Sequence, residues 1–333
     1  MSIKFKTTGY DEFIDFIKFY AIICVIFGHT FPLLDKIGYG IWAGMQVPLF
    51  VLVQSFHYLK KENVKINIRK ILGRIVVPFL IAEVLTFTIA MFVKGESATT
   101  LFHDFIHQGG YGPGSYYPYI YLQIALLLPA FAILLKRFNK TTLLIIFLLI
   151  SEGVEILFSL TNLPDIIYRL LAVRYIFLIY LAWLWVKDGI TINKTTILLS
   201  ILSLFAIIYF EYFNVNSEPW FYNTGWKSHR WPCYFFVSTS LIAILHHIWG
   251  GGKKYLRNNK FIIKTIKTIA SSSYEIFLVQ MSLIYLFTTK SIFFVSNIFI
   301  RYIMWLVIVW TVSIGGGILI NRIINCKNDK HNK

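Results

Sequence analysis

The sequence has few charged residues, and acidic residues are especially scarce. Only 14% of its 333 residues are Asp, Glu, Lys or Arg, and 16 of them are acidic. A soluble protein carries roughly 25% charged residues, whereas here 57% of the residues are hydrophobic and the mean hydropathy is +0.64. So few charges cannot cover a surface exposed to water, which excludes a soluble enzyme, a disordered chain and a coiled coil. The composition predicts a polytopic membrane protein.

Cysteine is also scarce. Cys24, Cys233 and Cys326 are odd in number and far apart, which excludes a disulfide framework and a CxxC metal site. The first apolar run has no small-residue cleavage site behind it, so we interpret it as a retained span rather than a signal peptide. Internal repeats, low-complexity segments and linkers are absent from the sequence. We therefore expect one integral-membrane domain over residues 1–333.

Ten apolar runs come close to the ~20 residues that a helix needs to cross a bilayer. The runs lack the alternation with a period of two that marks strands of a membrane β-barrel. We therefore predict an all-α fold with about ten transmembrane helices. Their expected ranges are 13–33, 41–59, 72–93, 115–135, 142–160, 166–186, 195–213, 231–249, 265–288 and 292–320.

Lys and Arg are distributed asymmetrically between the loops that this topology creates. Twenty-three of them fall on one side, with six in residues 60–74 and six in the loop expected at 251–267, and five fall on the other side. Positive loops remain in the cytoplasm, so both termini are predicted to be cytoplasmic. This topology accounts for the net charge of +16, and we expect no nucleic-acid partner.

Ionisable residues recur within the first apolar run, where they are costly and often functional. At 100° per residue, Asp11, Asp15, Lys18 and His29 fall on one helical stripe, which we expect to line a polar cavity. Lys18 and His29 are about 16 Å apart along the helix axis, and Asp15 lies further away still, so Asp15 cannot orient His29. The alternative is that Asp15 merely pairs with Lys18 while His29 bonds to a neighbour.

Several short motifs follow one another along the chain. They are IDFIK at 14–18 with GH at 28–29, MQVPLF at 45–50, RKILGRIVVPF at 69–79, GPGSYY at 112–117 and SYEIFLVQ at 273–280. In their order and spacing these motifs resemble the membrane acyltransferase family 3, from residue 14 to about 281. The chain departs from that family at Lys18, where Arg is usual, at Ile71 within an R-x-x-R pair, and at Gln280, where many relatives have His.

The resemblance implies transfer of an acyl group, most often acetyl, from cytoplasmic acyl-CoA to a hydroxyl of a cell-surface or lipid-linked glycan. It implies a bacterial plasma (inner) membrane enzyme surrounded by membrane lipids, with acyl-CoA as co-substrate and no tightly bound cofactor. Acyl transfer to a hydroxyl needs a base, and a buried neutral imidazole is suited to this near pH 7. We expect His29 to be that base, with Lys18 and Asp15 as further catalytic candidates on the stripe.

Two further groups of residues are expected to bind substrates. Arg69, Lys70 and Arg74 are predicted to hold the phosphates of CoA, although charges that only set the topology would look the same. The second group is predicted to contact the acceptor or the donor and consists of Glu152, Glu155, Arg174, Tyr116, Tyr117, Glu275 and Gln280. A structural ion pair between a Glu and an Arg is the alternative for the charged members.

Two other patterns do not predict a site. His103 and His107 have the i, i+4 spacing of a zinc helix, but Asp104 replaces the expected Glu and a third ligand is not evident, so we expect no metal. The GxGxxA pattern at 38–43 lacks the preceding strand of a dinucleotide site. Outside the acyltransferases, the main alternative is a transporter or flippase for a lipid-linked sugar; a glycan polymerase is a third.

Overall fold

The computed structural model describes eight segments of the chain. They are residues 2–3, 12–31, 45–61, 67–161, 164–191, 194–209, 231–291 and 295–331. Almost all of this part is helical, in agreement with the predicted all-α class. The helices of the first half are α1 (Glu12–Thr30), α3 (Gln46–Leu59), α4 (Ile68–Ile71), η2 (Leu72–Val76), α5 (Val77–Val93), α6 (Ala98–Gln108), α7 (Tyr117–Arg137) and α8 (Lys140–Leu160).

The second half continues in the same way. Its helices are α9 (Asp165–Leu170), η3 (Val173–Tyr175), α10 (Ile176–Asp188), α11 (Lys194–Ile208), α12 (Trp231–Phe236), η7 (Val237–Leu241), α13 (Ile242–Asn258), α14 (Lys260–Ser271), α15 (Ser273–Leu286), η8 (Thr289–Ser291) and α16 (Ile298–His331). Two short strands, β1 (Ser2–Ile3) and β2 (Ile190–Thr191), pair antiparallel and connect the N-terminal segment to the end of α10.

Several helices are long and apolar enough to cross a membrane. Within the described residues there are five: Glu12–Thr30, Leu72–Val93, Tyr117–Arg137, Lys140–Phe158 and Ile298–Cys326. The bent pair α14 and α15 makes a sixth if it is counted as one span. The protein is therefore a multi-helix membrane protein. Each of the ten predicted runs contains helix, but the count of ten and the cytoplasmic placement of both termini remain predictions.

Two expected segments have a different local structure. The predicted span 166–186 is interrupted, because residues 171–172 separate α9 from the helical turn that precedes α10. The side chain of Gln123 explains how this break is tolerated: its Nε2 donates to the carbonyl of Leu170, and its Oε1 accepts from the N–H of Ala172 at 3.0 Å. Backbone groups freed inside a membrane need such partners.

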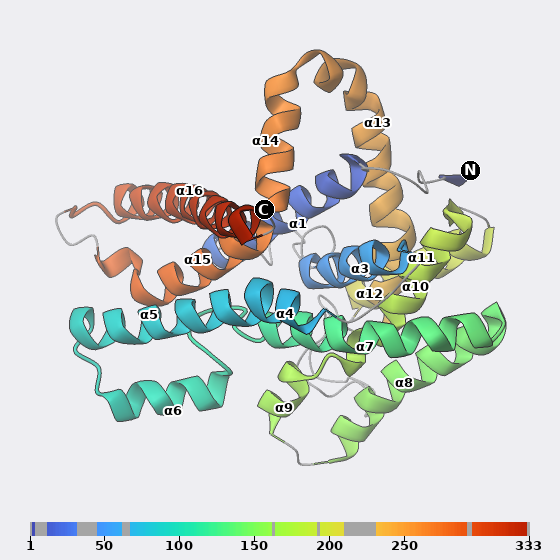
Figure 1. Cartoon of the computed structure of the whole chain (residues 1–333), viewed down its shortest axis with the longest axis horizontal. Coiled ribbons are helices and arrows are strands. Elements are labelled where there is room, and N and C mark those ends of the chain that lie inside the picture. Colours follow the sequence, from blue (N-terminus) through green and yellow to red (C-terminus); the bar gives the residue numbers. More distant parts are fainter. Residues whose placement is uncertain are drawn as a thin grey trace.

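The basic segment 251–267, expected as a loop, is helical instead. Helices α13 and α14 continue through it and meet at Asn259, forming a hairpin that projects from the bundle (Figure 1). Lys residues lie along one face of α14 and apolar residues lie along its other face, so α14 is an amphipathic helix rather than irregular backbone. The chain then turns by 67° between α14 and α15, at Ser272.

Helix α1 lies in the interior of the bundle. It packs against α3, α13, α14 and α15, as Figure 1 shows. Five of its apolar residues have no exposed surface, namely Ile14, Ile17, Ala21, Ile22 and Ile26. Because apolar neighbours surround this helix, its polar residues must point into the few polar spaces that the interior offers.

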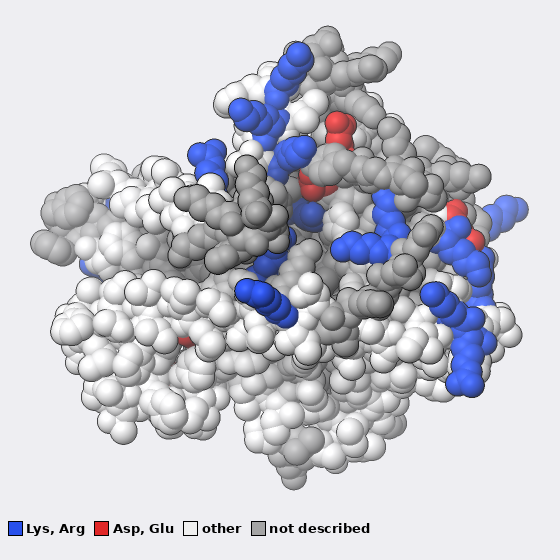
Figure 2. Space-filling view, in the orientation of Figure 1, with Lys and Arg blue, Asp and Glu red and all other residues white. Residues whose placement is uncertain are grey.

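Basic residues gather on one side of the molecule. In Figure 2, Lys and Arg cover α14, the centre of the view and the region where α7 ends and α8 begins, whereas the part built from α5 and α6 is mostly uncharged. Lys136 and Arg137 occupy the last turn of α7, and Lys140 begins α8, where it forms an ion pair with Asp188 at 2.6 Å. The placement of these charges on the cytoplasmic side of the membrane remains a prediction.

Candidate active site

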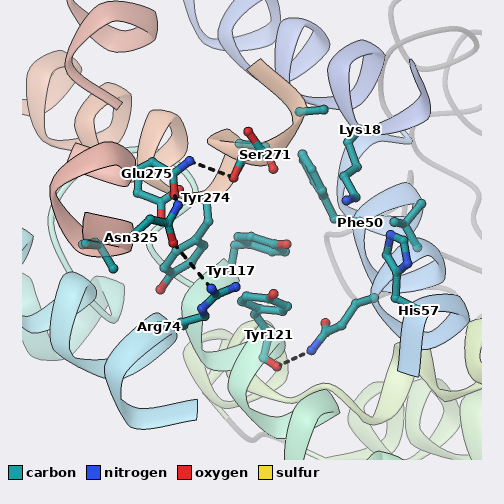
Figure 3. A pocket seen from close by; sticks show the side chains of 16 residues that line it. Lys18, Phe50, His57, Arg74, Tyr117, Tyr121, Ser271, Tyr274, Glu275 and Asn325 are labelled. Carbon is teal, nitrogen blue, oxygen red and sulfur yellow. Dashed lines mark hydrogen bonds between the residues drawn. The ribbon is translucent and has the colours of Figure 1, made fainter. Parts of the chain in front are cut away.

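A polar pocket of about 280 Å³ lies beside the first half of α1. Helices α1, α3, α7, α14, α15 and α16 and the η2 turn all contribute residues to it (Figure 3). Its lining consists of Lys18, Phe50, Val53, Gln54, His57, Arg74, Tyr117, Tyr121, Ala270, Ser271, Ser273, Tyr274, Glu275, Asn321, Ile324 and Asn325. Four of the residues proposed from sequence meet here: Lys18, Arg74, Tyr117 and Glu275.

Arg74 is held on one side of this pocket. It lies in the π-helical turn that leads into α5, just ahead of Pro78, which is tolerated in a first helical turn. Its guanidinium reaches the side-chain oxygen of Asn325 at 3.5 Å, and Asn325 in turn donates to Asn321 at 3.0 Å. Asn321 also donates to Ser272 Oγ at 2.9 Å. A chain of amides thus connects the guanidinium to the bend between α14 and α15.

Lys18 and His57 face Arg74 from the opposite side of the pocket, with Tyr117 and Tyr121 between them (Figure 3). Lys18 Nζ lies 3.4 Å from the carboxylate of Asp15, which is buried one turn below. The contact between Asp15 and Lys18 that the sequence offered as an alternative is therefore present. Among the described residues that line the pocket, the cations are Lys18 and Arg74 and the acidic residue is Glu275.

His29 does not line this pocket. It lies beside the glycine loop, residues 109–115, which joins α6 to α7. A Cβ placed on Gly114 would be 3.8 Å from His29 Nε2 and 3.0 Å from the ring of Phe277, and Gly114 has a φ of +86°. Only glycine combines this backbone conformation with so little space. A side chain at Gly114 would therefore contact both Phe277 and the imidazole. The sequence could not reveal this proximity, because 85 residues separate Gly114 from His29.

The glycine loop is held from two sides. Glu83 on α5 accepts the N–H of Tyr111 at 3.0 Å, and on the other side Gly112 packs against the carbonyl of Met281, leaving no space for a side chain. Tyr111 donates its hydroxyl to the carbonyl of Leu101 at 2.9 Å. Burial and nearby carboxylates raise the pKa of Tyr111 to about 12, so the phenol keeps its proton and this bond across the physiological pH range.

One aromatic pair lies between the polar pocket and His29. The ring of Tyr117 lines the pocket and meets the ring of Phe277 edge to face, with centroids 5.2 Å apart. Phe277 is the residue that also touches Gly114 beside His29. A ligand that reaches from the pocket to the imidazole must therefore pass or displace these two rings.

The other predicted residues lie elsewhere. Arg174 is completely buried, with its guanidinium within 6 Å of the rings of Tyr116, Tyr168 and Tyr175. Such cation–π contacts stabilise a buried charge, so both Arg174 and Tyr116 belong to a packed cluster outside the pocket.

Three of the remaining predicted residues also lie away from the polar pocket. Arg69 is exposed on α4, Glu152 is half-buried on α8, and Gln280 is completely buried on α15. None of them lines the pocket. The side chains of Lys70 and Glu155 lie outside the described residues.

Several residues that line the pocket were not proposed from sequence. They are Gln54, His57, Tyr121, Tyr274, Asn321 and Asn325. Two signals were available: Asn321 and Asn325 are spaced i, i+4 at the end of an apolar run, and His57 ends the second apolar run on the same side as Lys18. Tyr121 stacks on Tyr117 one turn away, with centroids 5.8 Å apart. Both tyrosines face the pocket, as residues four apart on a helix do.

An apolar groove of about 650 Å³ runs between α5, α15 and α16 and meets the polar pocket at Glu275 and Ile324. Exposed aliphatic side chains form part of its walls, including Ile81, Leu85 and Ile323.

No group of three or more possible metal ligands occurs in the part of the chain that the structure describes. His103 and His107 stack with centroids 4.1 Å apart, and the expectation of no metal remains a prediction.

Comparison with known proteins supplies the family. Residues 11–322 match the acyltransferase family 3 model, described as "Acyltransferase domain". Neither the curated proteins nor the solved structures gave a match. The match includes α1 with Lys18 and His29, the glycine loop and the pocket residues of α15 and α16 up to Asn321. Since it covers nearly the whole chain, the protein belongs to acyltransferase family 3 and is a membrane acyltransferase.

Proposed function

We propose that the protein transfers a short acyl group, acetyl in the first instance, from cytoplasmic acyl-CoA to a hydroxyl of a cell-surface or lipid-linked glycan. The observation that supports this proposal is the arrangement along α1. The polar pocket contains two cations, Lys18 and Arg74. The imidazole of His29, beside the glycine loop, lies about 16 Å further along α1 than Lys18. CoA is a long ligand, with phosphates at one end and the thioester at the other.

In this proposal the polar pocket binds the anionic end of CoA. Arg74 and Lys18 face each other across it, and guanidinium and ammonium groups are the usual partners of phosphate. Asn325 holds Arg74, and Asp15 holds Lys18, so both cations have fixed positions. The pantetheine arm would then extend past Tyr117 and Phe277, the rings between the pocket and His29.

The chemistry requires one base and one leaving group. The acceptor hydroxyl oxygen attacks the thioester carbonyl carbon while His29 takes the hydroxyl proton. The C–S bond then breaks, and the CoA thiolate receives that proton from the imidazolium. Because family membership makes the chain an enzyme, we propose this direct transfer in preference to transport of a lipid-linked sugar.

The test is acyl-CoA turnover by the purified protein in nanodiscs. We expect free CoA to appear and label from [¹⁴C]acetyl-CoA to enter an added membrane glycolipid extract. His29→Ala should abolish both signals while acyl-CoA still binds. If the folded wild-type protein binds no acyl-CoA of any chain length, the proposal is wrong. If it binds longer acyl-CoAs but not acetyl-CoA, the acetyl assignment is wrong.

A further inference from the structure

The interior beside His29 contains a buried amide without a partner. Gln280 has no exposed surface, and both its Nε2 and Oε1 lack a hydrogen-bond partner among the described residues. A buried amide in this state is costly, and native proteins rarely keep one without a functional reason or a bound water molecule. Ser313 on α16 is also completely buried, and its Oγ has no hydrogen-bond partner among the described residues.

The packing of α15 places Gln280 on the face of that helix that looks toward the glycine loop and α16. Phe277, which touches Gly114 beside His29, is three residues earlier, and Ile276, which touches Gly317, is four residues earlier. On an α-helix these spacings put Gln280 within 60° of both contacts and one turn further along the axis. Its amide therefore enters the interior between the glycine loop and α16.

The register between α15 and α16 brings this amide to within about one turn of the region where α16 contacts the end of α1. The two helices run antiparallel, with Ser272 bonded to Asn321 and Ile276 packed on Gly317. One further turn places Gln280 level with Ser313. Three residues from Ser313, Trp310 donates its indole N–H to Thr30 at 3.1 Å. Thr30 immediately follows His29, and its carbonyl accepts the hydroxyl of Tyr302. Helix α16 thus contacts the end of α1 between Tyr302 and Trp310, and Ser313, level with Gln280, is one turn beyond Trp310.

We propose that Gln280 donates its side-chain N–H to the carbonyl oxygen of the acyl group beside His29. This inference rests on the proposed function and supplies the group that direct transfer still lacks. As the acceptor oxygen attacks, the carbonyl π electrons move to the carbonyl oxygen, and an N–H aimed at that oxygen stabilises its negative charge. When the C–S bond breaks, the electrons return and the carbonyl re-forms with the amide unchanged.

A second glutamine provides a matched control. Gln123 also lies inside the bundle, but its amide is satisfied on both sides by Leu170 and Ala172. The same substitution, Gln to Met, keeps chain length and removes both polar groups. At Gln123 it should lower the Tm, because it leaves two buried backbone groups without partners. At Gln280 it should leave the Tm unchanged or raise it, since no protein hydrogen bond is lost.

The test compares the two variants in CoA release and in thermal unfolding. We expect Gln280→Met to lower kcat by about 10²- to 10³-fold, as loss of one oxyanion donor does, to raise the Kd for acyl-CoA by at most about tenfold through loss of one neutral hydrogen bond, and to leave the Tm no lower than that of the wild type. A Gln280→Met enzyme with wild-type kcat would overturn the inference and would point to a bound water instead. A Tm that falls as far as that of Gln123→Met would also overturn it, in favour of a structural role.

A spectroscopic measurement on the wild-type protein is independent of how the variant folds. The infrared band of a ¹³C=O thioester should move to lower wavenumber when acyl-CoA binds, because a hydrogen bond to the carbonyl weakens the C=O bond. A band identical to that of free acyl-CoA would overturn the inference. A different result would contradict the proposed function itself: the wild-type protein would release no CoA and bind no acyl-CoA.

Discussion

The two ends of α1 provide contrasting environments. At the Lys18 end the polar side chains border an open pocket, and most have a partner: Lys18 with Asp15, Arg74 with Asn325, and Gln54 with the carbonyl of Tyr121. At the His29 end, the half-buried imidazole lies beside Gly114 of the glycine loop, which also packs on Phe277, and Gln280 is buried one turn further along α15. In the proposed function, one helix therefore serves two tasks, binding of a charged ligand at one end and chemistry at the other.

The separation has a physical reason. Phosphates remain hydrated and bind best where water still reaches the cations, since full desolvation of charges is expensive. Attack on a thioester gains from the opposite environment, because dipoles that point at a developing charge act more strongly where water is excluded. About 16 Å of helix lies between the two environments, so both requirements are met within one ligand.

The largest expected effect is at the His29 end. His29→Ala should lower kcat by about 10²- to 10⁴-fold, the usual contribution of a general base. The Kd for acyl-CoA should stay within about twofold of wild type, because the imidazole lies outside the polar pocket. Stopped-assay CoA release and isothermal titration measure the two quantities. If His29→Ala lost as much affinity for acyl-CoA as it lost in kcat, binding and chemistry would not be separated between the two ends of α1.

At the open end the effect should appear in binding. Arg74→Ala should weaken acyl-CoA binding by about 10- to 100-fold, in line with the loss of charge-assisted hydrogen bonds, and leave kcat at saturation little changed. Arg74→Lys should restore part of the affinity, since it keeps the charge but not the bidentate fork. Arg137→Ala, an exposed cation at the end of α7, is the control for general charge. Equal losses in both variants would contradict a specific site.

A pair of glycines tests how tightly α15 and α16 are packed. A Cβ at Gly317 would lie 2.5 Å from the backbone of Ile276, whereas one at Gly315 meets nothing within 4 Å. We expect Gly317→Ala to lower the free energy of unfolding by about 1–3 kcal/mol through overpacking. Gly315→Ala should raise it by up to about 1 kcal/mol through helix propensity. Unfolding of both variants in mixed micelles gives the comparison, and matching values would refute the close contact.

The smallest effect should come from Asp15. The buried carboxylate pairs with the partly exposed Lys18 at 3.4 Å and does not itself line the polar pocket. Asp15→Asn should therefore change the Kd for acyl-CoA by less than about fivefold and kcat by less than about twofold. Steady-state kinetics decides the matter: a kcat loss approaching that of His29→Ala would make Asp15 part of the chemistry after all.

The sequence predicted the helices well and the contacts between them poorly. Long apolar runs specify helices in a membrane because backbone groups must bond within the segment, and each predicted run contains helix. The interruption at 171–172 was not predictable, because it depends on the amide of Gln123, a residue almost fifty positions away. The bend at Ser272 falls within three consecutive serines, a local signal that a search for apolar runs ignores.

The candidate site divides in the same way. Lys18 and His29 were identified because ionisable residues inside a span are rare, and Arg74 because it lies in a motif. Their separation into two environments depends on the glycine loop and on Phe277, which reach His29 from distant parts of the chain. Arg174 was proposed for the same reason as Lys18, but three tyrosines that the sequence does not connect surround its charge. Helical spacing predicts which residues share one face of a helix, but it does not predict which residues of other elements lie opposite that face.

The projecting hairpin of α13 and α14 has a practical consequence for imaging. Small membrane proteins are difficult to align in electron micrographs, because a detergent micelle hides most of their features. Here the two helices meet at the single residue Asn259, and α14 rests directly on α1. A rigid helical domain inserted at Asn259, continuous with both helices, would carry the orientation of α1 out of the micelle and provide a marker for particles with and without acyl-CoA.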